Sequence, residues 1–370
     1  MLTYTMNNHV SVLEISGNAL EHNLQFFKNK LHQKTKILAV VKAFGYGSDA
    51  NKVAYFLKDK VDYFAVAYAH EGVSLRKAKI TTPILVLHPQ IQNFDEIIKN
   101  QLEPSIYNLK TLNAFITHAK EKEIKSYPIH LKFNTGLNRL GFSKVNIPEI
   151  MEIICSSNQV KIKSIFSHLA ASDDNNERQF TLNQLQNFKE IISQVCNYIE
   201  YTPMAHTLNT SGVINYPEAQ FDMVRIGIGL YGFGNNEKET SQLKNTHILR
   251  SIISQIHIAK KGETVGYNRA FKASKDTTIA TIPIGHADGL SRKLGNGNGY
   301  ITIQSQKAPI IGNVCMDMIM VNITDIKCNE GDPVFIFETQ EDILNISKLS
   351  ETISYEILTL ISQRIKRSLI

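Results

Sequence analysis

Lys42 stands at the end of an apolar run and opens a turn whose residues could do chemistry. The run, 37–41, is rich in β-branched side chains, which is typical of a buried strand. The turn that follows contains Gly45, Tyr46 and Gly47. Burial lowers the pKa of an amine, and a neutral amine is a nucleophile that can form a Schiff base. The turn therefore suits a phosphorylated aldehyde, although this stretch alone fits equally well a lysine that escapes into solvent.

Four further groups of polar residues follow predicted strands. They are Lys132 and Arg139, Ser167 and His168, His206 with Asn209 and Thr210, and Arg225 with Gly227 and Ile228. In barrel enzymes the reacting groups gather at the C-terminal ends of the strands, so we expect these residues on the same rim as Lys42. A single histidine at a strand end is more often structural, whereas five polar groups on one rim favour an active site.

Eight short apolar runs predict the strands that position these residues. They lie at 37–41, 62–66, 83–87, 103–106, 129–133, 161–166, 204–208 and 222–225, and helical patterns separate them. The fourth and the last have the weakest pattern. Repeated βα units favour a parallel sheet, and eight of them allow closure into a TIM-like (β/α)8 barrel. An open doubly wound sheet is the alternative fold, and it requires two or three of these strands to be absent.

The pattern changes after about residue 243 and predicts a mostly antiparallel β domain with a helical tail near 345–367. We predict a barrel domain over 10–242 and a β-rich domain over 243–370, which the N-terminal residues 1–15 could join. The first barrel helix is expected at 18–31. The runs that predict strands of the second domain are 248–258, 277–284, 300–303, 308–311, 318–323 and 333–337.

The composition is that of a globular protein without a nucleic-acid or membrane partner. The chain has 370 residues, of which 43% are hydrophobic and 20% charged, so it is long enough for two domains. The net charge of +6 comes from scattered residues, and we interpret the densest basic cluster, 364–367, as a solvated helix end. No apolar run is long enough to cross a bilayer, and residues 1–8 resemble no secretory signal.

The cysteines indicate a reducing compartment and no metal site. Cys155, Cys196, Cys315 and Cys328 have neither the spacing of metal ligands nor that of a disulfide framework. We therefore expect a cytoplasmic protein without a bound metal.

Four segments together resemble the alanine racemases of the barrel type. They are 39–47, 132–141, 224–232 and 312–317, and the match runs in order from about residue 10 to 367. The set is specific, whereas the lysine motif alone would also fit decarboxylases and small cofactor-binding proteins of the same fold group. The resemblance implies a homodimer with shared active sites that interconverts L- and D-alanine and supplies D-alanine for peptidoglycan.

The resemblance also implies pyridoxal 5′-phosphate, bound through a Schiff base to Lys42. The implied cofactor-binding residues are Lys42, Tyr46, Arg139, His168, Asn209, Thr210, Arg225, Gly227, Ile228 and Tyr355. Arg225 matches the arginine that faces the pyridine nitrogen. Because a guanidinium does not give up its proton, that nitrogen should stay neutral, which weakens the electron sink and limits transamination. A bridge from Arg225 to a backbone carbonyl is the structural alternative.

Racemisation needs a second base on the opposite face of the external aldimine, and Tyr267 matches it by resemblance. The family's tyrosine reaches the cofactor of the partner subunit. A tyrosine pKa of about 10 is poorly matched to neutral pH, so the phenolate needs stabilisation. His168, Arg225 and His206 match the hydrogen-bonded chain that leads away from that tyrosine, and they complete the implied catalytic set.

Substrate binding is implied for Arg139 and for the backbone of Met316. Lys132 matches a lysine that many relatives carry as a carbamate. An amine reacts with carbon dioxide to give an anion, which would pair with Arg139 and avoid two adjacent positive charges. We therefore predict carbamylation of Lys132.

The sequence departs from the family's common pattern at three positions. Phe44 replaces a common Asn, Asn134 a common Asp, and His286 a common Tyr at the substrate entrance. Asp173 and Arg292 match other entrance residues. The change at His286 could alter access or side-chain preference.

Three other functions stay open from the residues. A serine or broad-specificity racemase would share every catalytic residue. A diamino-acid decarboxylase would share the barrel and the lysine but should lack Arg225 and Tyr267. A non-catalytic carrier of the cofactor would also share the barrel, but the region after residue 243 argues against it because such carriers typically have one domain.

Overall fold

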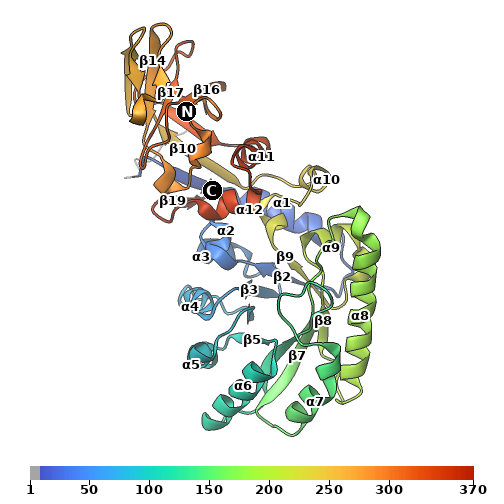
Figure 1. Ribbon diagram of the computed structural model, residues 1–370. Helices are drawn as coiled ribbons and strands as arrows, with labels where there is room; N and C mark the ends of the chain where they lie inside the picture. Colours follow the sequence, from blue (N-terminus) through green and yellow to red (C-terminus); the bar gives the residue numbers. More distant parts are fainter. Residues whose placement is uncertain (1–8) are drawn as a thin grey trace.

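The computed structural model describes residues 9–370 and contains a parallel barrel with a separate β-sheet domain (Figure 1). The predictions that residues 1–8 could join the second domain and that they contain no secretory signal concern positions outside the described residues. Hydrogen-bonded neighbours in the barrel follow the order β8-β7-β6-β5-β4-β3-β2-β9, and every pairing is parallel. The strands are β2 (Lys36–Val40), β3 (Tyr63–Val66), β4 (Ile84–Val86), β5 (Glu103–Ile106), β6 (Tyr127–Lys132), β7 (Val160–Phe166), β8 (Met204–His206) and β9 (Met223–Ile226).

Backbone hydrogen bonds between the segments of β8 and β9 complete the ring. The amide of Asp222 donates to Ala205 O at 3.0 Å, and that of Arg225 to Leu208 O at 3.0 Å. All eight predicted strands are therefore present, including the two with the weakest pattern, and the open doubly wound alternative is wrong. Buried apolar runs form these strands because helices cover the outside of the barrel while side chains fill its inside.

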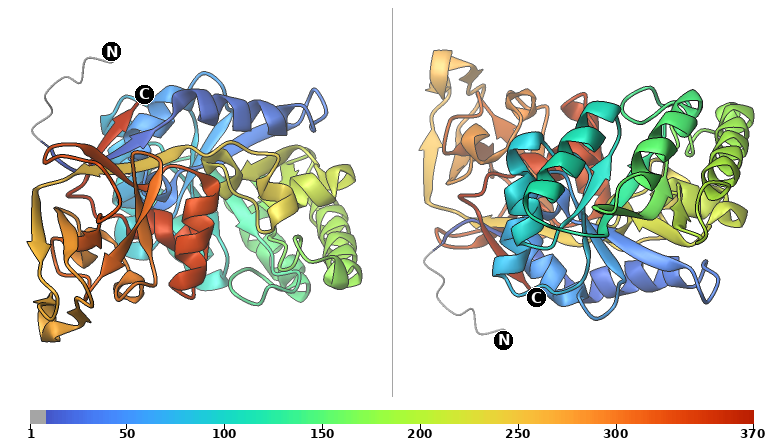
Figure 2. Two further views of the ribbon diagram at one scale, coloured as in Figure 1. Left: turned by 90° about the horizontal axis from the view of Figure 1, so that it is seen from above. Right: turned by 90° about the horizontal axis from the view of Figure 1, so that it is seen from below.

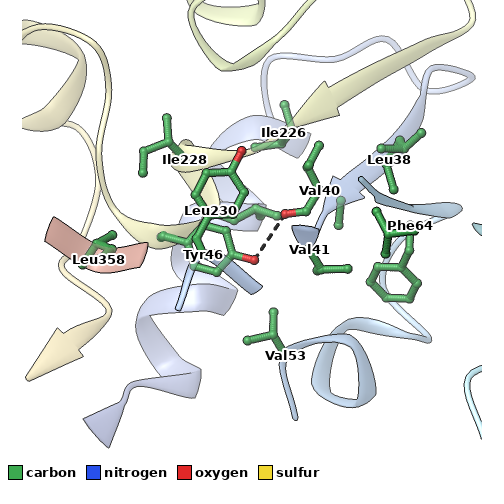
Figure 3. Packing of buried hydrophobic residues seen from close by; sticks show 14 of the residues in the cluster. Leu38, Val40, Val41, Tyr46, Val53, Phe64, Ile226, Ile228, Leu230 and Leu358 are labelled. Atoms are coloured by element: carbon green, nitrogen blue, oxygen red, sulfur yellow. Dashed lines mark hydrogen bonds between the residues drawn. The ribbon is translucent and has the colours of Figure 1, made fainter. Parts of the chain in front are cut away.

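Helices surround the barrel and bury one apolar face each. They are α1 (Gly17–Lys28), α3 (Ala50–Leu57), α4 (Ala69–Lys77), α5 (Phe94–Lys99), α6 (Leu109–Glu121), α7 (Ile147–Cys155), α8 (Arg178–Cys196) and α9 (Thr210–Asn215), with the short α2 (Lys42–Tyr46) and α10 (Glu237–Thr240) on the connections. Side-chain caps fix two starts, since Ser16 accepts from Ala19 N and Asn108 from Thr111 N. Figure 3 shows part of the core, where Val40 and Tyr46 gather with residues of the β9 region.

The second domain is built on a nine-stranded sheet in the order β11-β14-β17-β16-β15-β18-β10-β1-β19. Its pairings are antiparallel except that of β1 with β19, which is parallel. The strands are β1 (Val12–Ile15), β10 (His247–Ile252), β11 (Gln255–Ala259), β14 (Thr277–Ile282), β15 (Tyr300–Ile303), β16 (Gln306–Ile311), β17 (Ile319–Asn322), β18 (Pro333–Phe337) and β19 (Lys366–Leu369), beside a ribbon of β12 (Thr264–Val265) and β13 (Phe271–Lys272). β1 thus lies in the sheet of the second domain and not in the barrel.

Two predictions for this domain are wrong in part. The run 248–258 is two strands, β10 and β11, and not one. The tail at 345–367 is two helices, α11 (Gln340–Leu349) and α12 (Ser354–Leu360), followed by an extended segment that ends in β19. Pairing with β1, which lies more than 350 residues earlier, makes 366–369 a strand, and no local pattern records that. In Figure 1, α12 lies between the sheet domain and α2 of the barrel, and α11 lies next to α12; Figure 2 shows the same two domains from above and from below.

Residues 9–370 lack two features that would indicate a membrane span or a metal centre. No helix in this range has the length and hydropathy needed to span a membrane. No group of three or more His, Cys, Asp and Glu side chains in the same range could hold a metal ion.

Candidate active site

The turn after Lys42 is left-handed over five successive residues. Residues 43–47 all have positive φ, between 51° and 83°. Only two of the five are glycine, and each of the others costs about 1–2 kcal/mol in this conformation. The turn then ends at Asp49, whose carboxylate caps α3 by accepting from two backbone amides. The surrounding structure must therefore stabilise this turn.

Groups far along the chain hold the left-handed turn in place. Arg367 Nε donates to Gly47 O at 2.8 Å, and Glu71 Oε1 accepts from Ala43 N at 2.7 Å. A side chain at position 47 would place its Cβ 2.0 Å from Leu358 O, so α12 packs directly on the turn. Sequence reasoning missed these roles of Glu71 and Arg367.

Arg367 corrects the interpretation of the basic cluster. The side chain was expected at a solvated helix end, but the residue is 4% exposed. Its guanidinium also donates to Ser362 O, Ile365 O and Ile361 O. Arg364, in the same cluster, forms salt bridges with Asp288 and Asp317. The two arginines thus connect the C-terminal segment to the turn after Lys42 and to Asp288 and Asp317. The sequence showed only that basic residues gather at 364–367.

The structure brings eleven of the candidate residues to one cavity of about 630 Å³ at the C-terminal rim of the barrel. They come from the ends of β2, β6, β7, β8 and β9, from the loops after them and from α12. The cavity contains Lys42, Tyr46, Lys132, Arg139, His168, Asn209, Thr210, Arg225, Gly227 and Ile228, and Tyr355 completes its wall.

The cavity carries positive charge without a carboxylate to balance it. Four of its side chains are basic, and none of the described residues that line it is acidic. Lysines and arginines gathered in a low dielectric are unfavourable unless an anion joins them. The donor set therefore fits a ligand with a dianionic group and a carboxylate, together with a carbonyl that an amine can attack.

The two lysines of the cavity have lowered pKa values. Burial, and then the charge of Arg139, lower the pKa of Lys42. Burial and the charges of Arg139, Arg225 and Lys42 lower the pKa of Lys132 to about 8. The amine of Lys132 is thus partly neutral near neutral pH, and burial shifts the pKa of Lys42 in the same direction. A neutral amine can attack an aldehyde or carbon dioxide.

Hydroxyls and backbone amides form the side of the cavity between β9 and α12. Thr210 Oγ1 accepts from Gly227 N at 3.3 Å and from Gly229 N at 3.3 Å. A Cβ at position 227 would lie 2.6 Å from Tyr46 Oη, so only glycine leaves that hydroxyl and the backbone accessible together. Tyr355 Oη donates to Asn235 Oδ1 at 2.8 Å. Such hydroxyls and amides suit a phosphate.

Asn209 has a structural role within this site. Its Oδ1 accepts from Gly212 N at 2.9 Å and from Ser172 Oγ at 2.8 Å, so it caps α9. The cap holds Thr210 at the first position of the helix, where it lines the cavity.

Arg225 is buried and donates to five acceptors. Nη1 donates to His206 Nδ1 at 2.7 Å and to His206 O, while Nη2 donates to His168 Nδ1 at 2.9 Å, Ser167 O and Thr207 O. Burial lowers the pKa of Arg225 to about 9, which leaves it protonated at neutral pH. Burial and the charge of Arg225 also hold the pKa values of both histidines well below their ordinary value. Each histidine is therefore neutral and accepts at Nδ1.

Tyr267 and Met316 lie away from the Lys42 cavity. They line a separate hollow of about 940 Å³ on the second domain. Tyr267 is 71% exposed and Met316 59% exposed. The single chain thus does not bring the second predicted base to the first.

The predicted entrance residues are also spread over both domains. Asp173 lies in the loop after β7, and its charge helps to raise the pKa of Tyr355, after the larger effects of burial and Tyr46. His286 is exposed and lines a third hollow with Glu351 and Glu356. Its backbone amide donates to Cys315 O at 2.9 Å, next to Met316. Arg292 begins the short turn Arg292–Leu294 in the same domain.

Comparisons with known proteins agree along the whole chain. The alanine racemase N-terminal domain matches residues 15–234, and the alanine racemase C-terminal domain matches residues 247–369. Alanine racemase 2 of Oceanobacillus iheyensis is 36% identical, over 96% of this chain and 92% of its own length. Alanine racemase of Helicobacter pylori J99 is 33% identical, over 98% of this chain and 99% of its own.

Solved structures of alanine racemases also match this chain over nearly its full length. That of alanine racemase from Clostridium difficile 630 has a TM-score of 0.91 at 33% identity, and the match covers 97% of this chain and 95% of that one. That of alanine racemase from Bartonella henselae, with covalently bound pyridoxal phosphate, has a TM-score of 0.86 at 28% identity and covers 98% and 99%.

Proposed function

Because the chain belongs to the alanine racemase family, we propose that it interconverts L- and D-alanine with pyridoxal 5′-phosphate in the Lys42 cavity. The observation that carries the proposal is the charge of this cavity, which holds four basic side chains and no acidic one among its described residues. A phosphate and an amino-acid carboxylate supply the missing negative charge.

The residues present fit this cofactor. Lys42, an amine with a lowered pKa, would hold its aldehyde carbon. Tyr46, Thr210, Tyr355 and the backbone of Gly227 would bind its phosphate. When bound, the cofactor withdraws electrons from the substrate's Cα and so makes the Cα proton acidic enough to remove.

Lys42 Nζ and Tyr267 Oη are proposed to hold the proton on opposite faces of the substrate. Lys42 can serve one face only, because it is fixed at the end of β2. Tyr267 lies exposed on the second domain, outside the Lys42 cavity of the same chain. This separation supports a homodimer in which the partner subunit supplies the tyrosine, with the Met316 backbone as a substrate contact.

Arg139 is proposed to orient the substrate carboxylate, and Lys132 to carry a carbamate beside it. The pKa of Lys132, lowered to about 8, supports the reaction of its amine with carbon dioxide. The carbamate would place a negative charge among Arg139, Arg225 and Lys42, whose charges lower that pKa.

Arg225 argues for racemisation over decarboxylation or transamination. Its guanidinium donates to two neutral histidines and three carbonyl oxygens, and among residues 9–370 it forms no salt bridge with a carboxylate. A protonated Arg225 facing the pyridine nitrogen would keep that nitrogen unprotonated. The site then favours return of the proton to Cα.

The cellular role follows from the product. In a bacterium, D-alanine would supply peptidoglycan precursors in the cytoplasm, and the four free cysteines are compatible with a reducing compartment. We also propose a domain boundary near residues 242 and 243, which lie between the two matched family domains.

The test is chiral analysis of the purified holoenzyme with L-alanine in deuterated water. We expect D-alanine to form and deuterium to enter Cα. Parallel reactions contain L-serine, L-lysine and L-ornithine, and Lys42→Ala is the negative control. Faster inversion of serine, or release of carbon dioxide from the diamino acids without alanine inversion, would contradict the proposal.

A further inference from the structure

A chain of polar side chains continues from Arg225 into the barrel interior. His206 Nε2 lies 2.9 Å from Ser164 Oγ, and Ser164 Oγ lies 2.6 Å from His130 Nδ1. His130 Nε2 then lies 2.6 Å from Glu103 Oε2. These four residues come from the adjacent strands β8, β7, β6 and β5, and they run from the last residue of β8 to the first residue of β5.

This row of four hydrogen-bonded side chains, here called the relay, is shielded from water along its length. His206, Ser164 and His130 are fully buried, and the side chain of Glu103 is 12% exposed. Buried polar groups are costly unless each is hydrogen-bonded, and here every one is. Sequence patterns hardly indicate this row of polar groups, because His130 and Ser164 are single polar residues within strands.

Neutral histidines and a carboxylate at position 103 leave only one consistent order of donors and acceptors in this relay. Arg225 Nη1 can only donate, so His206 Nδ1 accepts and His206 Nε2 carries the hydrogen. That hydrogen goes to Ser164 Oγ, whose own hydrogen goes to His130 Nδ1. His130 Nε2 must then donate to the carboxylate of Glu103, which accepts.

Reversing the hydrogen bond between position 103 and His130 would disturb the hydrogen bond between Arg225 and His206. A hydrogen donated from position 103 to His130 Nε2 would place the hydrogen of His130 on Nδ1. If Ser164 then donated its own hydrogen to His206 Nε2, the hydrogen of His206 would lie on Nδ1. His206 Nδ1–H would then face Arg225 Nη1–H, donor against donor. An acceptor at position 103 therefore stabilises the order of hydrogens in which Arg225 keeps its bond to His206.

From this geometry we propose that Glu103 is a positioning residue for Arg225, acting through His130, Ser164 and His206. The inference rests on the proposed function, in which Arg225 faces the cofactor. Glu103 fixes both histidine tautomers, and these hold the guanidinium in the orientation that lines the cavity. Glu103 touches neither substrate nor cofactor.

A purely structural role of Glu103 is the competing explanation. Glu103 also shares a hydrogen bond with Tyr63, and its charge acts on Arg76 and Tyr127. A structural role would lower stability through these neighbours, whereas a positioning role would change the histidine tautomers and the reaction at the rim. The test must separate the two.

The experiment compares Glu103→Leu, Ser164→Ala and the double variant as holoenzymes. Glu103→Leu removes the acceptor at one end of the relay, and Ser164→Ala interrupts the relay in its middle. Asp95→Leu is the matched control, because Asp95 is an exposed carboxylate bonded to His118 at 3.2 Å. We measure kcat and KM for alanine, pyruvate formed per turnover, thermal stability, and ¹⁵N spectra of labelled histidines with and without cofactor.

Each single variant should lower kcat about tenfold with KM little changed, the lower end for removing a group that fixes a histidine tautomer. Pyruvate per turnover should rise, and the His206 nitrogen signals should shift in both variants. The double variant should lose no more than the stronger single one, because both changes interrupt the same relay.

Losses that multiply in the double variant, or an unchanged His206 spectrum in both single variants, would overturn the proposal. So would losses that follow thermal stability alone. The ¹⁵N spectra of the cofactor-free protein test the relay even if the wild type proves not to racemise alanine. Failure of the proposed function is therefore distinguishable from failure of this inference.

Discussion

Two regions of the molecule differ in how far their side chains are buried and bonded within the chain. They are the cavity at the barrel rim and the hollow around Tyr267 on the second domain. At the rim, Arg225 is fully hydrogen-bonded and Lys42 is held by a strained, clamped turn. Around Tyr267 the side chains are exposed, and Met316 and Met318 are 59% and 44% exposed.

The difference indicates how the work of the site is divided. Buried polar groups are positioned before any ligand arrives, so the rim is preorganised for electrostatic work. Exposed large apolar side chains around a single tyrosine are typical of a surface that another protein covers. One half of the proposed site is thus provided within the chain, and the proposal assigns the other half to a second copy.

The largest expected effect on activity comes from removing Lys42 or Tyr267, the two proposed bases, and then combining the two variants in one dimer. Lys42→Ala and Tyr267→Phe should each lower activity by about 10³-fold or more, since each removes a group that holds the proton. If the sites are shared, a mixed dimer of the two variants contains one site with both changes and one intact site. Random mixing makes half of the dimers mixed, so about a quarter of wild-type activity should return.

The measurement is alanine racemisation after unfolding and refolding the two variants together with the cofactor. Each variant refolded alone is the control for contamination. A mixture no more active than the sum of the separate variants, with mixed dimers verified by mass, would show that the exposed tyrosine does not serve a partner's lysine.

A second change tests the preorganised half alone. Arg225→Lys keeps the charge but loses the planar fork that reaches two histidines and three carbonyls. We expect kcat to fall about 10- to 100-fold and thermal stability to fall as well, because buried acceptors lose their donors. An equivalent change on the exposed half, Arg269→Lys, should leave both quantities almost unchanged. Equal effects at the two positions would remove the contrast.

The barrel was predictable because buried parallel strands are continuous apolar runs, and such runs mark their own positions. Even the segment 103–106, which contains Pro104, is a strand as predicted, because it pairs with β4 on one side and β6 on the other. The strand at 366–369 was not predictable. Its Lys-Arg-Ser-Leu sequence has no strand pattern, and its state depends on pairing with β1 at the other end of the chain.

The site shows the same limit. Motifs near strand ends identified the residues of the cavity, and two glycines signalled a special turn after Lys42. They did not predict that Ala43, Phe44 and Tyr46 would also take positive φ, because the forces that hold them come from Arg367 and α12. Nor could spacing reveal the bond between His130 and Glu103, which only the barrel brings together.

A smaller effect should appear in the pH dependence of stability. The folded-state pKa of Lys132 is lowered to about 8 from an ordinary 10.5, so folding disfavours the charged amine. The penalty is complete below about pH 8 and disappears as the pH rises through about 10.5. At pH 7 it is about 3 kcal/mol, at about 1.4 kcal/mol per pKa unit. Lys132→Met should therefore stabilise the cofactor-free protein at pH 7 and not at pH 10.5.

Chemical unfolding of both forms across this range, in buffer free of carbon dioxide, measures the difference. Bicarbonate should stabilise the wild type and leave Lys132→Met unaffected, if a carbamate forms beside Arg139. A constant difference between the two forms at all pH values would contradict the burial of a charged amine. Intact mass after trapping tests the carbamate itself.

The smallest expected effect is at the entrance, where His286 stands in place of the family's common tyrosine. His286 is exposed and lies outside the Lys42 cavity of its own chain, and its backbone supports the loop that carries Met316. Surface substitutions of this kind usually change free energies by less than about 0.5 kcal/mol, so His286→Tyr should change KM for alanine by about twofold and leave kcat unchanged. Steady-state rates in both directions measure this, with His257→Tyr, another histidine on the second domain, as the control. A tenfold change in KM confined to the His286 variant would mean that this side chain contacts the substrate. The exposed half of the site would then bind substrate in addition to supplying Tyr267.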